Sequence, residues 1–358
     1  MTESRNVSKP IGVIEALSTG YRLLNRAWSV WLIPLSLDLL FWLGPQISPW
    51  AALRSLFEQL DPDMRSLLAT NMGLDALDWS QPPPGPNLLT LVSLGPGAPS
   101  TLASTFGFLP APDIWPRPML SVGSPWGLVG LMLALLFVSA PISGLYLALA
   151  SRAVEKLPWS PTPHTPAPPF GNILFDLKAR RSQMKSDSLA ERWQWIALHL
   201  VLLTALFVFI AGIMVVGLSV GMALGLLMNP ALGAVIAGIG TLMLTWLLLL
   251  TWVLFYFTPA SIALDRQTAW QALSRSAKVV ARNLGSSMGL ILISLLIAEG
   301  FALIWRRFFF AWPGVLLSLA GNAYLTSGLT LAAFIFYRDR HARLVDHPIT
   351  SMPSSHTE

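Results

Sequence analysis

Long hydrophobic runs, separated by shorter polar stretches, dominate the pattern of this 358-residue chain. A helix needs about 20 apolar residues to cross the roughly 30 Å hydrocarbon core of a bilayer, and six runs approach or exceed that length. The sequence therefore predicts six membrane-spanning helices, at residues 28–44, 126–150, 195–227, 231–259, 287–305 and 313–337. Asn229-Pro230 predicts a hairpin turn between the third and the fourth.

These runs predict an all-α fold, a polytopic bundle of transmembrane helices. A hydrophobic content of 54% and a mean hydropathy of +0.59 exclude an ordinary soluble domain. The chain has no cysteine, which excludes disulfides and thiolate metal sites. The expected parts are an amphipathic helix (1–27), a first span (28–44), an insertion (45–125), a second span (126–150), a proline-rich, basic linker (151–194), a hairpin (195–259), an elbow (260–286), a last pair of spans (287–337) and a tail (338–358).

Lysine and arginine are unevenly distributed, and cytosolic loops of membrane proteins are enriched in them. With the N-terminus inside, the cytosolic segments hold 18 of the 23 basic residues; the external ones are Arg54, Arg65, Arg117, Arg306 and Arg307. We therefore expect a prokaryotic cytoplasmic membrane protein with both termini in the cytosol. The first apolar run follows no cleavable signal and is expected to remain as an anchor.

The external insertion (45–125) combines two patterns. Leu53, Leu56, Phe57 and Leu60 have helical spacing, which Asp61-Pro62 interrupts. A proline-rich loop follows, with apolar patches at 88–94 and 106–109. We expect these patches to lie among the headgroups or to cover the bundle, where they would cap helix ends or serve as a lid. The insertion is also the predicted contact for a membrane-protein partner.

The stretch "LDRQTAWQALSRSAKVVARNLG" (264–285) is polar and regular between two apolar runs. Thr268 and Gln271 form a capping-box pattern, and Gly285 is the expected stop. On a helix, one face carries Trp270, Leu273, Ala277, Val280, Ala281 and Leu284, whereas the opposite face carries Arg275, Lys278 and Arg282. This predicts an amphipathic elbow helix lying in the cytosolic interface, with its apolar face on lipid or on the bundle and its basic face on anionic headgroups.

A similar elbow occurs at residues 13–28, which align with 269–284 at a shift of 256. Four of the sixteen positions are identical, and Arg22 and Arg26 fall on Lys278 and Arg282. Both segments immediately precede a predicted span. We therefore expect Arg22 and Arg26 to contact headgroups as well.

The segment "FYFTPASIALDRQTAWQALSRSAKVVARNLG" resembles the recurring segment of the multi-span membrane domain fused to some glycerophosphoryl diester phosphodiesterases, a domain whose stand-alone relatives are of unknown function. The matching positions are Phe257, Pro259, Asp265, Ala272, Leu273, Arg275 and Ser276. The resemblance covers roughly residues 249–292. It implies an all-α membrane bundle and carries over no catalytic residue.

Ionisable residues within spans are functional candidates by default. Asp38 and Glu299 are the two acids, and Asn322 in the sixth span could reach a similar depth. Glu299 shares a helical face with Arg306 or Arg307. Three interpretations follow: a buried polar clasp of the first, fifth and sixth spans, a proton or cation relay or headgroup site, or snorkelling arginines at the interface.

Small residues recur every four positions in the third span, at Gly217, Gly221 and Gly225. Ala234 and Gly238 give the fourth span a matching face. Small residues let helix backbones approach closely, so we expect packing within this hairpin, or self-association as the alternative.

The spacing G-x-S-x-G occurs at 217–221 and 285–289, but there it lies in predicted helices and not at the strand-to-helix turn of a nucleophile elbow. No phosphate-binding loop, dinucleotide-binding turn or zinc motif is found in the sequence. The expected function is therefore non-enzymatic, without cofactor or metal: a scaffold or accessory protein that engages anionic lipid headgroups or a membrane complex. The alternative is a small-solute or lipid-linked transporter that uses Asp38, Glu299 and Asn322. The net charge of +5 follows the cytosolic loops, so nucleic acid is not a predicted partner.

Overall fold

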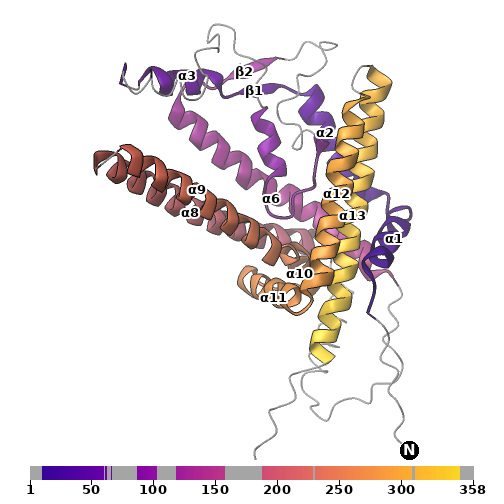
Figure 1. Cartoon of the computed structure of the whole chain (residues 1–358). Coiled ribbons are helices and arrows are strands. Elements are labelled where there is room, and N and C mark those ends of the chain that lie inside the picture. The colour runs from indigo at the N-terminus through magenta and orange to yellow at the C-terminus, as the bar shows by residue number, and fades with distance from the viewer. Residues whose placement is uncertain are drawn as a thin grey trace, which may run out of the picture.

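The structure, a computed structural model, describes residues 10–59, 61–62, 66, 87–102, 118–157, 188–228, 230–308 and 311–346. It confirms the all-α class: long helices pack side by side as a bundle (Figure 1). The helices are α1 (Val13–Leu24), α2 (Ser29–Leu43), α3 (Trp50–Glu58), the short 3-10 helix η2 (Leu88–Ser93), α6 (Pro125–Glu155), α8 (Leu189–Met228), α9 (Pro230–Leu254), α10 (Thr258–Asp265), α11 (Ala269–Arg282), α12 (Leu284–Arg306) and α13 (Trp312–Asp346).

Within the described residues, five helical segments are long and apolar enough to cross a membrane. A sixth results if α1 and α2, which meet at an angle of 83°, are counted as one broken span. The chain is thus a multi-pass helical membrane protein. At 15 residues, α2 is only about 22 Å long, shorter than a hydrocarbon core of about 30 Å.

Several element boundaries differ from the sequence prediction. Helix α8 begins at Leu189, before the predicted start at 195, and the predicted fourth span (231–259) is broken, because α9 ends at Leu254 and α10 begins at Thr258. The elbow helix α11 ends at Arg282, and α12 begins at Leu284, so Gly285 lies inside α12 and is not the stop. Asn283 ends α11 instead, and its Nδ2 donates to the carbonyl of Val279. Helix α13 continues to Asp346, so the first part of the predicted tail extends the sixth span.

A short pair of strands joins the two ends of the insertion. Strand β1 (Gln46–Ser48) follows α2, and strand β2 (Met119–Ser121) precedes α6; they pair in parallel. The pairing places α3 near the start of α6, as Figure 1 shows. We call this the strand end of the bundle. The opposite end, which holds α1, α10, α11 and the C-terminal part of α13, is the elbow end.

Helix α13 forms the centre of the bundle, and two thirds of its apolar window is buried. Its closest approach is to α1, where a Cβ at Gly20 would lie 2.7 Å from the backbone nitrogen of Ala332. Only a residue without a side chain fits there. The Tyr21 hydroxyl donates to the carbonyl of Leu325, and the Tyr324 hydroxyl donates to Oδ1 of Asn25. The first elbow is thus fixed on the last helix.

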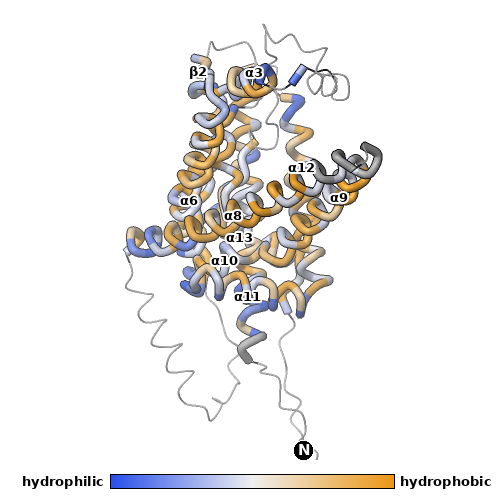
Figure 2. The backbone as a smooth tube through the Cα atoms, turned by 90° about the vertical axis from the view of Figure 1, so that its left-hand side faces the viewer, coloured by the Kyte–Doolittle hydropathy of each residue, from blue (hydrophilic) through white to orange (hydrophobic). Residues whose placement is uncertain are grey.

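Helices α8 and α9 form a hairpin that leaves the bundle at a steep angle (Figure 1). Its outer parts are the least buried of the candidate spans, with 17% of the apolar window buried in α8 and 6% in the α9–α10 segment. Figure 2 shows hydrophobic residues along nearly all of this hairpin. The exposed surface is therefore of the kind that faces lipid.

Candidate functional site

Part of the insertion, residues 87–102, folds back into the bundle; we call it the inner segment. Asn87 fixes its start, because its Oδ1 accepts from the backbone nitrogens of Ile47 and Leu89. Its Nδ2 donates to the carbonyls of Phe41 and Pro45, both at 3.3 Å. One side chain therefore joins the end of α2, strand β1 and helix η2.

Two glycines let the inner segment approach the helices closely. A Cβ at Gly95 would lie 1.8 Å from Oγ of Ser139 in α6. Gly97 has a φ of +69°, in the left-handed region that favours glycine, and packs between Leu147 of α6 and Pro259 of α10. The contact with Pro259 shows that the inner segment runs from the strand end almost to the elbow end.

Asp38 binds the C-terminal end of the inner segment. Its side chain is fully buried in α2, and its Oδ2 accepts a hydrogen bond of 3.0 Å from the backbone nitrogen of Leu102. On α13, the Thr326 hydroxyl donates to the carbonyl of Ser100 at 3.2 Å. Non-helical backbone at membrane depth is tolerated where protein surrounds it, and α2, α6 and α13 surround this segment.

The polar clasp expected from the sequence is not formed. Asn322 is buried on the face of α13 that also carries Leu319 and Thr326, toward the inner segment. Its Nδ2 finds no hydrogen-bond partner among the described residues. Glu299, in contrast, is exposed on the outer face of α12, as are the arginines of the predicted clasp, Arg306 and Arg307. Asp38 and Asn322 therefore both face the inner segment, whereas Glu299 and the two arginines lie on the outside of the bundle.

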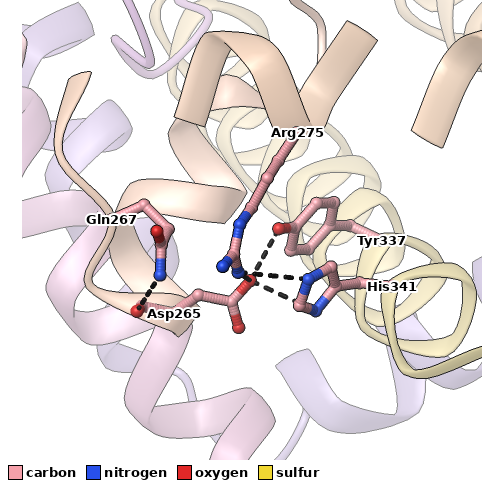
Figure 3. Close-up of polar contacts among 5 residues, drawn as sticks. All are labelled: Asp265, Gln267, Arg275, Tyr337 and His341. Carbon is pink, nitrogen blue, oxygen red and sulfur yellow. Dashed lines mark hydrogen bonds and ion pairs between the residues drawn. The ribbon is translucent and has the colours of Figure 1, made fainter. Parts of the chain in front are cut away.

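A second polar cluster lies at the elbow end, around the carboxylate of Asp265 at the end of α10 (Figure 3). Oδ2 of Asp265 accepts a hydrogen bond of 2.6 Å from the Tyr337 hydroxyl. It also lies 3.4 Å from Nδ1 of His341 and 3.7 Å from Nη1 of Arg275. Gln267 donates to the backbone carbonyl of Asp265 at 3.1 Å. The cluster joins α10, α11 and α13.

The hydrogen bonds define the tautomer of His341. Nη1 of Arg275 lies 3.1 Å from Nε2 of His341. A guanidinium can only donate, so Nε2 accepts and the ring carries its proton on Nδ1, directed at Asp265. The His341 ring also stacks on Tyr337, with 5.5 Å between the ring centroids. This geometry suits a neutral imidazole, because a second ring proton would face the guanidinium.

Ser276 of α11 forms hydrogen bonds with the backbone at the break between α9 and α10. Its hydroxyl donates to the carbonyl of Leu254 at 2.8 Å and accepts from the backbone nitrogen of Phe257 at 3.1 Å. A helix break at the membrane surface leaves such groups without intrahelical partners. Phe257 is fully buried and stacks on Phe336 of α13. The residues of the family-like pattern therefore build a packed corner.

The elbow helix α11 turns only part of its predicted apolar face toward the bundle. The residues that face the bundle are Ala272, Leu273, Ser276, Val279 and Val280. Trp270 is 75% exposed and does not face inward. Helix α11 begins at Ala269 as predicted, but the Thr268 side chain makes no capping hydrogen bond. Val279, which belongs to neither of the two faces predicted from the sequence, is fully buried because the inward face is centred on Ser276.

The predicted headgroup residues separate into two groups. Lys278 and Arg282 of α11 and Arg22 and Arg26 at the first elbow are exposed at the elbow end. Arg275 is different, because its side chain, although partly exposed, contacts Asp265 and His341. Arg275 was expected to contact lipid headgroups; in the structure it contacts the cluster around Asp265.

The small residues of the hairpin make contact only near its turn. A Cβ at Gly225 would lie 2.9 Å from the Cα of Gly233, and one at Gly221 would lie 3.8 Å from Ile236. Gly217 and Gly238 meet no atom within 4 Å and take no part in the contact. The Ala234 side chain lies outside the described residues.

Comparison with known proteins gives one match. A family model described as a domain of unknown function (DUF7847) matches residues 173–336. This range contains Asp265, Arg275, Ser276 and Glu299, whereas Asp38 and the inner segment lie outside it. No curated protein and no solved structure matches the chain.

Proposed function

We propose that this protein is a non-enzymatic scaffold or accessory protein of a prokaryotic cytoplasmic membrane. One observation carries the proposal: the carboxylate of Asp38 is fully buried and accepts the backbone N–H of Leu102. A transporter needs a solvated path to its polar groups at mid-membrane. Here the buried acid holds a segment that occupies the space between α2, α6 and α13, and the other acid, Glu299, lies outside the bundle.

Two surfaces support a role in binding. The exposed basic residues of the elbow end, which include Arg22, Arg26, Lys278 and Arg282, suit a cytosolic leaflet of anionic lipids. Each basic residue near such a leaflet contributes about 1 kcal/mol. At the other end, the paired strands and α3 fix part of the insertion as a platform for a membrane complex. In this orientation both termini lie in the cytosol.

Transport of a small solute or lipid-linked molecule is the second candidate. Irregular backbone beside an intramembrane acid is the pattern of many transporter sites. The buried Asn322, whose Nδ2 has no partner among the described residues, favours this candidate. The two candidate functions predict different water access to Asn322. A transporter requires water at this residue, whereas a scaffold does not.

The proposed kinship with the membrane domain of glycerophosphoryl diester phosphodiesterases rests on the sequence pattern alone. Its acid, arginine and serine correspond to Asp265, Arg275 and Ser276, whose contacts stabilise a helix corner. A structural role for the pattern supports a shared architecture and implies nothing about phosphodiester chemistry.

Thiol accessibility tests the proposal, because the chain has no cysteine of its own. Asn322→Cys would be treated with a membrane-impermeant thiol reagent in oriented vesicles. The scaffold predicts no labelling from either side. The matched control, Lys278→Cys, is exposed at the elbow end and should react from that side only. Rapid labelling of Asn322→Cys would overturn the proposal and favour transport.

A further inference from the structure

Helix α12 presents a regular seam on its outer face. Five residues follow each other at alternating steps of four and three, the spacing of a coiled-coil seam. All five are exposed: Leu292, Leu296, Glu299, Leu303 and Arg306. Leu296 is 73% exposed, the most exposed leucine of the helix. The inward face is separate and consists of Ser287, Leu290, Ile291, Ser294 and Ala302.

Glu299 makes this seam unsuitable for lipid alone. It lies about 22 Å along α12 from Leu284 and about 10 Å before Arg306, within the hydrocarbon layer. No hydrogen bond or ion pair is found for Glu299 in the described part of the chain. An acid that faces hydrocarbon carries a large free-energy cost, so such residues pair with another polar group.

We propose that this seam is the contact between two copies of the chain, related by a two-fold axis along the membrane normal. In a parallel pair of helices each seam position faces its own counterpart. Glu299 of one copy then meets Glu299 of the other at the same depth. By symmetry, a second copy places a polar group at the same depth as Glu299, whereas a different partner would have to carry its own polar residue at that depth.

The polar residues of the seam suit this arrangement. Two carboxyl groups in contact can form a hydrogen-bonded polar pair, in which a protonated carboxyl donates to the other group. One heptad further on, Arg306 of each copy lies at the strand end, where its head group can reach water. The leucines on either side of Glu299 pack against their counterparts and exclude lipid.

This inference goes beyond the proposed function and is independent of it. The scaffold proposal depends on Asp38 and the inner segment, whereas the dimer depends on α12. A monomeric protein with an inaccessible Asn322 would overturn the dimer only.

Cysteine cross-linking in vesicles tests the contact. Leu296→Cys and Leu303→Cys should each form a disulfide-linked dimer after mild oxidation, because both positions face their counterparts. The control, Leu248→Cys, is also exposed but lies on α9 and should remain monomeric. Absence of linked dimer for both seam variants, in protein that is folded, would overturn the inference.

Substitution of Glu299 tests the acid itself. In a dilution assay with fluorescently labelled full-length chains, Glu299→Leu should weaken association by about tenfold, the effect of losing one strong interhelical hydrogen bond. Glu299→Gln should retain most of the association, because two amides can pair in the same place. Equal association of Glu299→Leu and the unaltered chain would contradict the proposal. Since Glu299 has an exposed side chain, neither change disturbs the core.

Discussion

Asp38 and Glu299 present the same signal in the sequence, a single acid within an apolar run, yet the fold places them in opposite surroundings. Asp38 is fully buried and bonded to the backbone of Leu102. Glu299 is exposed on the outer face of α12, with leucines around it. The first acid satisfies a backbone group of its own chain. The second has its polar group available to another molecule. Depth in a span therefore does not define the role of an acid; the helix face does.

The largest expected effect follows from replacing Asp38 by leucine. The change removes the hydrogen bond between the Asp38 carboxyl group and Leu102 and leaves the Leu102 N–H buried without that acceptor. We expect a loss of about 3 kcal/mol in the free energy of unfolding. Titration of folded protein with a denaturing detergent, followed by tryptophan fluorescence, measures it. Asp38→Asn keeps an acceptor and should lose about 1 kcal/mol or less; equal losses for both variants would show that the hydrogen bond is unimportant.

Gly97→Val disturbs the same inner segment without touching an acid. A valine at position 97 would be held in the left-handed backbone conformation, which is unfavourable for a β-branched residue. Its side chain would also clash with Leu147 and Pro259. We expect a loss of about 2 kcal/mol, mainly from strain and overpacking. Gly212→Val is the matched control, because a Cβ there meets nothing within 4 Å. If the two variants unfold at the same detergent concentration, the inner segment does not pack against α6 and α10.

A third acid, Asp265, provides an intermediate case, since it is partly exposed at the elbow end. Tyr337→Phe removes its shortest hydrogen bond, of 2.6 Å, while Arg275 and His341 remain. We expect a loss of about 1 kcal/mol, typical of one hydrogen bond. Protease sensitivity at the α10–α11 turn offers a local measurement. Unchanged sensitivity would mean that the cluster does not hold this corner.

Glu299→Leu should have the smallest effect on the fold. Because the side chain lies outside the bundle, we expect the free energy of unfolding to stay within about 1 kcal/mol of its original value. The measurement is the same detergent titration, at a protein concentration low enough to keep the chain monomeric. A loss as large as that of Asp38→Leu would place Glu299 inside the fold and remove the contrast between the two acids.

Hydrophobic run length was sufficient to predict the all-α class and the positions of the long helices, because a bilayer imposes a minimum apolar length. Helical periodicity placed α11 but did not orient it. The inward face is centred on Ser276, which bonds to Leu254 and Phe257, and on the buried Val279. A pattern of apolar residues cannot distinguish protein from lipid as the surroundings. The same limit explains why Glu299 was expected in a clasp.

The position of the inner segment inside the bundle could not be predicted from the sequence, for a different reason. Its proline-rich surroundings are typical of a surface loop, and its hydrogen bonds join residues far apart in the chain. Asn87 bonds to Phe41 and Pro45, and Leu102 bonds to Asp38. Two local signals were present: the asparagine before a pair of leucines, which suits a helix cap, and the glycines at 95 and 97.

The position of the inner segment inside the bundle is the central claim, and one disulfide tests it directly. Gly95→Cys combined with Ser139→Cys brings two Cβ atoms to 2.8 Å in a chain that has no other cysteine, so a shift of about 1 Å gives the spacing of a disulfide. The structure predicts that mild oxidation in the membrane links them within one chain, which mass spectrometry of the digested protein would detect. If both thiols stay free, and an impermeant reagent labels the cysteine at position 95 from outside, the segment lies on the surface and the account is wrong.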